Sequence, residues 1–132
     1  MGKTFTLEEA NRSLVFVAQV LREVQKNWDE LMTSQGAEDK LSEAVIQGKI
    51  NRLKACNEEL DQVGCIMRDP IEGLLDFPSF YKDRPVFLSW KLGEEQVEFW
   101  HELNENPRHR RSANEEFVAW NSSIPLPDLN LA

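Results

Sequence analysis

Apolar residues recur at alternating intervals of three and four positions along the first quarter of the chain. The repeat consists of Leu7, Ala10, Leu14, Val17, Leu21, Val24, Trp28 and Leu31. This is the a/d spacing of a heptad, which places all of these side chains along one side of an α-helix. Thr6 and Glu9 match a capping box, in which each side chain bonds the backbone N–H of the other residue. The pattern predicts a helix over about residues 7–33, ended by Ser34-Gln35-Gly36.

A second and weaker heptad follows. Its apolar positions are Ile46, Ile50, Leu53 and Leu60, with Asn57 in the same register. Gly48 costs roughly 1 kcal/mol relative to Ala inside a helix, so we expect this helix to be the less stable one. It should cover about residues 38–63 and pack antiparallel on the first helix, because the connection is short. Asn57 either sets the register of the two helices from a buried position or lies at the edge of the hairpin.

After Gly64, turn residues separate four short apolar runs, at residues 65–68, 74–77, 86–90 and 96–101. Short strands joined by tight turns are typical of an antiparallel meander, so we place four strands within residues 64–101. Pro78-Ser79 is expected to be one of the turns. The last run, 96–101, fits either a strand or a helix, and the alternation of its apolar residues favours a strand.

The fold class that follows is α+β. A long antiparallel helical hairpin precedes a four-stranded antiparallel β-meander, and both belong to a single domain of residues 1–111. Residues 112–132 are expected to form an extended C-terminal tail that packs on this domain, because Pro125 and Pro127 prevent a long terminal helix. A chain of 132 residues is long enough for one domain with a real core.

The net charge of the chain argues against some classes of binding partner. Its net charge is −8, and acidic residues occur in both halves. Binding to nucleic acid or to an anionic membrane requires a basic surface, so neither is an expected partner. The first residues lack the apolar core of a signal peptide, which predicts a cytoplasmic protein in which Cys56 and Cys65 are reduced thiols.

Three sequence blocks resemble one known family. They are Phe5-Thr6-Leu7-Glu8-Glu9-Ala10-Asn11, then Asp69-Pro70-Ile71-Glu72-Gly73-Leu74-Leu75-Asp76-Phe77-Pro78, and finally Trp90-Lys91-Leu92-Gly93-Glu94 followed by Trp100-His101. Their order and spacing resemble the bacterial family called domain of unknown function 2203. The resemblance implies a small cytoplasmic protein of unassigned activity. The chain departs from the family pattern at Val15, where proline is frequent, and at Asn106–Arg111, where a Gly-Phe and Gly-Arg stretch is usual.

Polar residues in the predicted meander provide one candidate site. Asp76 interrupts an apolar run, and a buried carboxylate needs a partner or a metal ion. Asp76, Glu94 and His101 could together bind a divalent metal ion and leave positions open for water. The alternative is structural: Asp76 caps a bend or pairs with Arg68 or Arg84, and Glu94 belongs to a turn.

Two further features could bind a partner. Asp69, Trp90 and Trp100 could line a groove for a peptide or a flat ligand, unless the two tryptophans belong to the sheet core. The basic residues Arg108–Arg111 either pair with carboxylates of the domain or dock an acidic partner or a phosphate.

We therefore expect a non-enzymatic binding or interaction module that forms a homodimer through its helical hairpin, with a protein or a small molecule as a further possible partner. The alternative is a hydrolase-like enzyme that uses a divalent metal ion at Asp76, Glu94 and His101. No other cofactor is predicted, since the chain has no glycine-rich nucleotide-binding motif.

Overall fold

The computed structural model describes residues 3–34 and 41–123. Two long helices, α1 (Leu7–Ser34) and α2 (Glu43–Val63), precede the sheet, and a third helix, α3 (Glu115–Ser123), follows it. The strands are β1 (Ile66–Asp69), β2 (Leu74–Tyr81), β3 (Arg84–Lys91), β4 (Phe99–Glu102) and β5 (Arg111–Ser112), and a 3₁₀ turn, η1, covers Pro107–His109. Every strand pairs antiparallel with the next, in the order β1-β2-β3-β4-β5. The predicted α+β class is thus confirmed, with five strands in the described residues instead of four.

The predicted helical hairpin is present, but its second helix starts later than predicted. The capping box at the start of α1 is confirmed, since Thr6 N–H donates to Glu9 Oε1 at 2.9 Å and Glu9 N–H donates to Thr6 Oγ1 at 3.1 Å. Helix α2 starts at Glu43 instead of 38, because the Ser42 hydroxyl caps it by accepting a hydrogen bond from Val45 N–H. Residues 38–40 lie outside the described residues. Asn57 is exposed, as expected for a position at the edge of the hairpin.

The turn predicted at Pro78-Ser79 is wrong, because β2 continues through both residues to Tyr81. Strand β1 pairs with β2 only as far as Asp76, so the missing N–H of Pro78 does not interrupt that ladder. The segment before α1 pairs there instead, since Phe5 N–H donates to the carbonyl of Pro78 at 2.8 Å. Strand β2 then turns into β3 through two residues with positive φ, Lys82 and Asp83, as in a type I′ hairpin.

The run at 96–101 forms a strand, as favoured, but β4 starts only at Phe99. Residues 112–123, which were predicted to be part of an extended tail, form regular structure instead. Ser112 belongs to β5, and Glu115–Ser123 form α3, which Asn114 caps through a hydrogen bond from Phe117 N–H. An Asn cap followed by Glu115 and Glu116 supports a short helix, although the segment has no sustained apolar repeat. Residues 124–132 lie outside the described residues.

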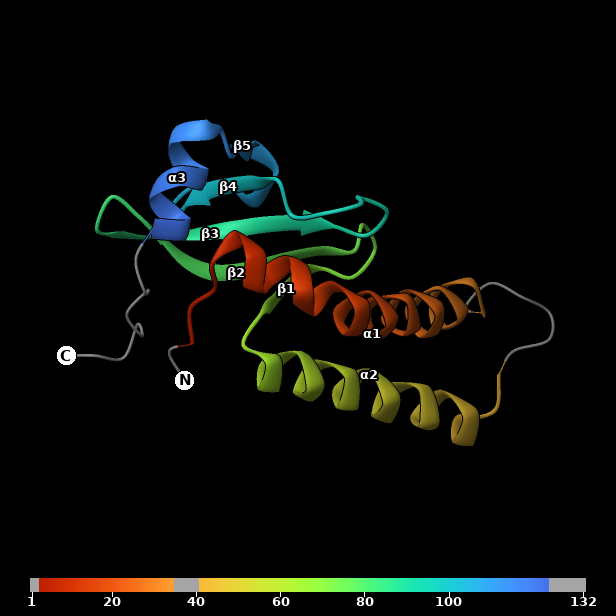
Figure 1. Cartoon of the computed structure of the whole chain (residues 1–132). Coiled ribbons are helices and arrows are strands. Elements are labelled where there is room, and N and C mark those ends of the chain that lie inside the picture. Colours follow the sequence, from red (N-terminus) through yellow and green to blue (C-terminus); the bar gives the residue numbers. More distant parts are fainter. Residues whose placement is uncertain (1–2, 35–40, 124–132) are drawn as a thin grey trace.

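Helix α1 lies between the sheet and α2 (Figure 1). The middle of its heptad is therefore buried within the chain, in a core that α1, α2 and the sheet share. This core includes Val17, Leu21, Val24, Leu60, Leu75, Phe77, Leu88, Trp90, Trp100 and Phe117. The distal half of the hairpin extends past the ends of the strands (Figure 1). Among the described helices, none combines the length and the apolar character that crossing a bilayer requires.

Candidate functional site

The two faces of the sheet differ in character. Leu75 and Phe77 of β2 point into the core, so alternation along the strand puts Asp76 on the opposite face. Ser89 of β3 is the cross-strand partner of Asp76, and His101 of β4 is the partner of Phe87. This outer face therefore brings together polar residues from three strands.

Asp76 is the centre of a buried ion-pair cluster on this face. Its exposed fraction is 0% and that of His101 is 1%. Arg68 Nε donates to Asp76 Oδ2 at 2.8 Å, and His101 Nε2 lies 2.9 Å from the same oxygen. The predicted pairing of Asp76 with Arg68 is thus present, and it satisfies a carboxylate that would be costly to bury alone. Within the described residues, the other oxygen, Asp76 Oδ1, and the hydroxyl of Ser89 have no hydrogen-bond partner.

Both ring nitrogens of His101 face acceptors. Nδ1 lies 2.8 Å from the carbonyl oxygen of Glu102, which can only accept, so Nδ1 carries a proton. Nε2 faces the carboxylate of Asp76, which favours a second proton and an imidazolium. Burial lowers the pKa of His101, but the hydrogen bond and the charge of Asp76, with the Glu102 carbonyl, outweigh it and raise the pKa above its usual value. A doubly protonated imidazole has no lone pair for a metal ion.

Glu94, the third residue of the predicted metal site, is held elsewhere. Its carboxylate pairs with Arg110, with Nη1 to Oε1 at 2.9 Å, and it also accepts from Lys91 N–H at 2.8 Å. In the described part of the chain, no group of three or more His, Cys, Asp or Glu residues is placed to hold a metal ion. The structure thus brings together Asp76 and His101 but not Glu94, and the divalent-metal site stays a prediction.

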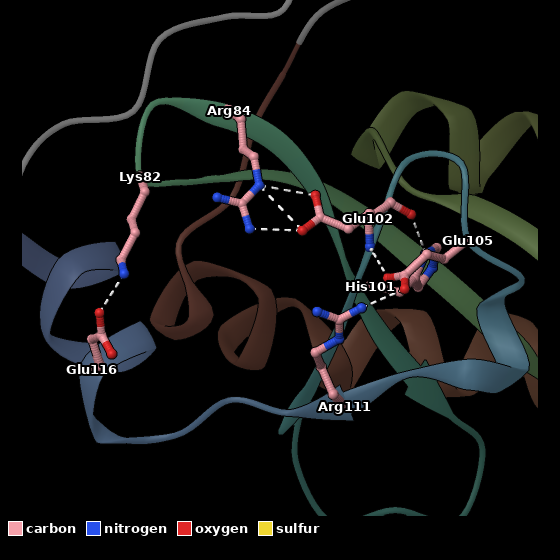
Figure 2. Close-up of polar contacts among 7 residues, drawn as sticks. All are labelled: Lys82, Arg84, His101, Glu102, Glu105, Arg111 and Glu116. Atoms are coloured by element: carbon pink, nitrogen blue, oxygen red, sulfur yellow. Dashed lines mark hydrogen bonds and ion pairs between the residues drawn. The ribbon is translucent and has the colours of Figure 1, made fainter.

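The arginines of the basic segment pair with carboxylates of the same domain. Arg108 pairs with Asp69 and Glu72, Arg110 with Glu94, and Arg111 with Glu105. Figure 2 shows the last pair beside two others, Arg84 of β3 with Glu102 of β4 and Lys82 of the β2–β3 turn with Glu116 of α3. The guanidinium of Arg110 also lies 4.2 Å from the ring centre of Phe99. These contacts fit the structural alternative for the basic segment.

The structure places Asp69, Trp90 and Trp100 in three different surroundings. Asp69 accepts hydrogen bonds from the N–H groups of Ile71 and Glu72 and so shapes the β1–β2 turn. The buried indole of Trp90 donates to the Glu94 carbonyl at 3.0 Å. Trp100 is buried at the other end of the core, where it stacks on Phe117 with ring centres 5.1 Å apart. Both tryptophans belong to the buried core, which fits the alternative expectation, and Trp90 also lines a hollow of about 460 Å³ beside α1. The groove for a peptide or a flat ligand stays a prediction.

The cysteines are also structural in character. Cys56 and Cys65 are free and buried. Burial raises the pKa of the Cys65 thiol to about 12 and also raises that of Cys56. A thiol of such high pKa is a poor nucleophile at neutral pH.

A different site lies where α1 passes the edge of the sheet. A hollow of about 500 Å³ separates the distal part of α1 from the β1–β2 turn. Its lining, which we call the α1 groove, consists of Arg22, Gln25, Lys26, Trp28, Asp29, Met32, Pro70 and Ile71. Gln25 Nε2 donates to the carbonyl of Ile71 at 2.8 Å and joins the two walls. The feature of the sequence that points to this site is the long heptad repeat of α1, which continues to Trp28 and Leu31, beyond the part of the helix that packs on the sheet.

The α1 groove combines exposed apolar side chains with polar and charged groups. Ile71 is 68% exposed and Met32 is 44% exposed. The indole nitrogen of Trp28 is buried and has no acceptor among the described residues. Among the described residues, no carboxylate lies within 4 Å of the charged groups of Arg22 or Lys26, although the charge of Lys26 helps to lower the pKa of Glu23 and Glu30. Because a buried indole N–H usually finds a partner, the hollow beside Trp28 is a candidate binding site.

Comparison with known proteins finds one family. Residues 3–113 match the model of a family described as an uncharacterized conserved protein (DUF2203). No curated protein and no solved structure matches the chain.

Proposed function

The chain belongs to the DUF2203 family of uncharacterized conserved proteins, and we propose that it is a non-enzymatic interaction module that self-associates through the α1 groove. The observation that carries the proposal is the buried Trp28 N–H, which has no acceptor among the described residues, in a hollow with exposed apolar side chains. An apolar hollow with a few directed polar groups is the usual form of a site for a peptide or protein segment.

The candidate catalytic side chains are buried or already engaged in hydrogen bonds and ion pairs, which supports a binding role over a catalytic one. His101 uses both ring nitrogens in hydrogen bonds, and Asp76 is fully buried against Arg68. Glu94 pairs with Arg110, while burial raises the pKa of both thiols. A catalytic acid, base or nucleophile needs access to substrate and an unengaged reactive atom.

The charges around the groove support a second copy as the partner. Two chains of net charge −8 repel each other over long range, so contact between them needs a local surface with both signs of charge. The groove has Arg22 and Asp29, which are two helical turns apart on α1. In an antiparallel, two-fold arrangement of two α1 helices, Arg22 of each copy lies beside Asp29 of the other. The same surface is then complementary to itself.

Sedimentation equilibrium of the full chain and of Ile71→Asp tests the proposal. Ile71 is exposed, so a carboxylate there leaves the fold intact and places an unpaired charge in the contact. We expect Ile71→Asp to weaken dimerisation at least tenfold. Leu103→Asp is the matched control, because Leu103 is an exposed leucine outside the groove. Equal dissociation constants for Ile71→Asp and the wild type would refute the proposed role of the groove.

A further inference from the structure

We propose that the two α1 helices of the dimer pack in one antiparallel register, in which Met32 of each copy enters a second hollow on its partner. This inference rests on the proposed self-association and names the residues that each copy contributes to the other. The second hollow is the one of about 460 Å³ that Trp90 lines, and its α1 wall consists of Leu14, Val15, Ala18, Gln19 and Arg22. Arg22 also lines the α1 groove, so the two hollows adjoin each other along α1.

Exposed apolar side chains are present at both hollows. Val15 at the second hollow is 77% exposed, while Ile71 and Met32 at the α1 groove are 68% and 44% exposed. Contact with a second copy removes this apolar surface from water, which is favourable. The β1–β2 turn lines one hollow and the loop after β3 lines the other, so both lie on the same side of α1. A two-fold axis perpendicular to the two helices keeps this side common to both copies.

Arg22 and Asp29 define the register of the two helices. The arrangement proposed above places Arg22 of each copy beside Asp29 of the partner subunit. Gln19 precedes Arg22 by three residues, and Met32 follows Asp29 by the same number. The two-fold relation therefore places Gln19 at the height of the partner's Met32 along the helix axis, with Val15 about 6 Å further along. The unbranched and flexible side chain of Met32 is suited to fill the hollow at this position.

The same register brings the exposed Ile71 of both copies together. Gln25 lies within one residue of the midpoint between Arg22 and Asp29, and therefore beside the two-fold axis. Its side chain donates to the Ile71 carbonyl at 2.8 Å, which holds Ile71 at the same height. Lys26 of both copies also lies near the axis, and Asp29 of each chain, three residues further along α1, offsets their repulsion. The register that pairs the charges thus also covers the apolar side chain at the centre of the interface.

Cysteine cross-linking of the full chain tests the register. Gln19→Cys and Met32→Cys proteins are mixed and oxidised, and non-reducing electrophoresis detects covalent dimers. We expect the mixture to form a disulfide dimer and each protein alone to form none. Within one chain, residues 19 and 32 are 13 residues apart, or about 20 Å along the helix, which is too far for a disulfide. Two copies of Gln19 on helices in this register are equally far apart.

Arg12→Cys mixed with Met32→Cys is the matched control. Arg12 is an exposed residue of α1, two helical turns before Gln19, so about 10 Å separates it from the partner's Met32 along the helix. We expect the disulfide to form at least tenfold more slowly in this mixture than with Gln19→Cys. The native Cys56 and Cys65 are buried and give the background in the wild type.

A charge exchange tests the same contact without new cysteines. We expect Met32→Lys to weaken dimerisation at least tenfold in sedimentation equilibrium, because it places an ammonium group in an apolar hollow that the partner's Arg22 also lines. Gln19→Glu in the same chain should restore at least part of the affinity, since its carboxylate faces the new ammonium group. Val118→Glu is the control second substitution, because Val118 is exposed on α3 outside both hollows. Equal recovery with Gln19→Glu and Val118→Glu would overturn the register.

The outcomes separate this inference from the proposed function. If the wild type is a dimer that Ile71→Asp weakens, but Gln19→Cys and Met32→Cys give no mixed disulfide, the groove is an interface and the register is wrong. A disulfide dimer of Gln19→Cys alone would indicate parallel helices and would also overturn the register. If the wild type is monomeric, both proposals fail.

Discussion

At the scale of single residues, Asp76 is a candidate catalytic carboxylate whose contacts stabilise the fold. The sequence identified it correctly as a carboxylate in an apolar strand that needs a partner. Arg68 comes from the neighbouring strand β1 and His101 from β4, on the far side of β3, and only the register of the sheet brings them within hydrogen-bond distance. Glu94 lies beyond the end of β3, so the sequence could not tell that it would pair with Arg110 instead.

The raised pKa of His101 makes stability depend on pH. The imidazolium is favoured in the folded chain relative to the unfolded one, whose histidine has an ordinary pKa of about 6.5. The contribution of the Asp76–His101 pair is therefore complete below about pH 6.5 and is lost as pH rises through the higher pKa of the folded chain. We expect His101→Gln to lower the free energy of unfolding by about 3–5 kcal/mol at low pH and by less at about pH 9. Urea denaturation at both pH values measures this, and a loss that does not change with pH would contradict a charged His101.

Addition of Mn²⁺ or Zn²⁺ tests the predicted metal site. If Asp76, Glu94 and His101 bind a divalent ion, its addition raises the Tm of the wild type, because a ligand of the folded state stabilises it by mass action. Asp76→Asn should then abolish the rise. The ion pairs of these three residues favour the other outcome, in which the Tm is the same with and without metal. A rise in Tm that depends on Asp76 would show that His101 releases a proton to bind the ion.

At the scale of elements, the turns decide the geometry of the groove. The β1–β2 turn and the loop after β3 meet at Gly73, whose carbonyl accepts from Leu92 N–H at 2.9 Å. Gly73 has φ +70°, and a Cβ there would lie 2.6 Å from Leu92 Cβ and 3.2 Å from Gln25 Nε2. Gly73 thus allows the close approach of both turns to α1.

Two glycine substitutions should have opposite effects. Gly73→Ala forces a positive φ on alanine and a clash with Leu92, so we expect a loss of about 1–3 kcal/mol in the free energy of unfolding. Gly48→Ala is the matched control, because the Cβ at Gly48 in α2 meets no atom within 4 Å. It should increase stability by up to about 1 kcal/mol. Equal effects of the two substitutions in thermal or urea denaturation would rule out this role for Gly73.

The sequence predicted the long elements better than the short ones. Helix α1 was found within one residue because its heptad and capping box agree. Strand β2 was cut short at Pro78, since the sequence does not show where β1 stops pairing. Helix α3 and the two-residue β5 were missed, because both depend on contacts far along the chain, such as Phe117 on Trp100.

At the scale of the whole molecule, the sheet is shorter than the hairpin that packs on it (Figure 1). Large exposed apolar side chains lie in both halves of α1, at Val15, Phe16 and Met32, so neither the sheet nor α2 covers the whole helix. Leu21, in the middle of the heptad, is fully buried within the chain. A charge at Leu21 would therefore unfold the protein, whereas one at Ile71 tests association alone.

The mass of the full chain in solution tests the central claim most directly. Light scattering at tens of micromolar, at moderate salt, reports that mass without a tag or a partner. Self-association through the α1 groove predicts a species of twice the 15.3 kDa chain mass, which Ile71→Asp converts to a single chain. A wild-type species of one chain mass at this concentration would contradict the account.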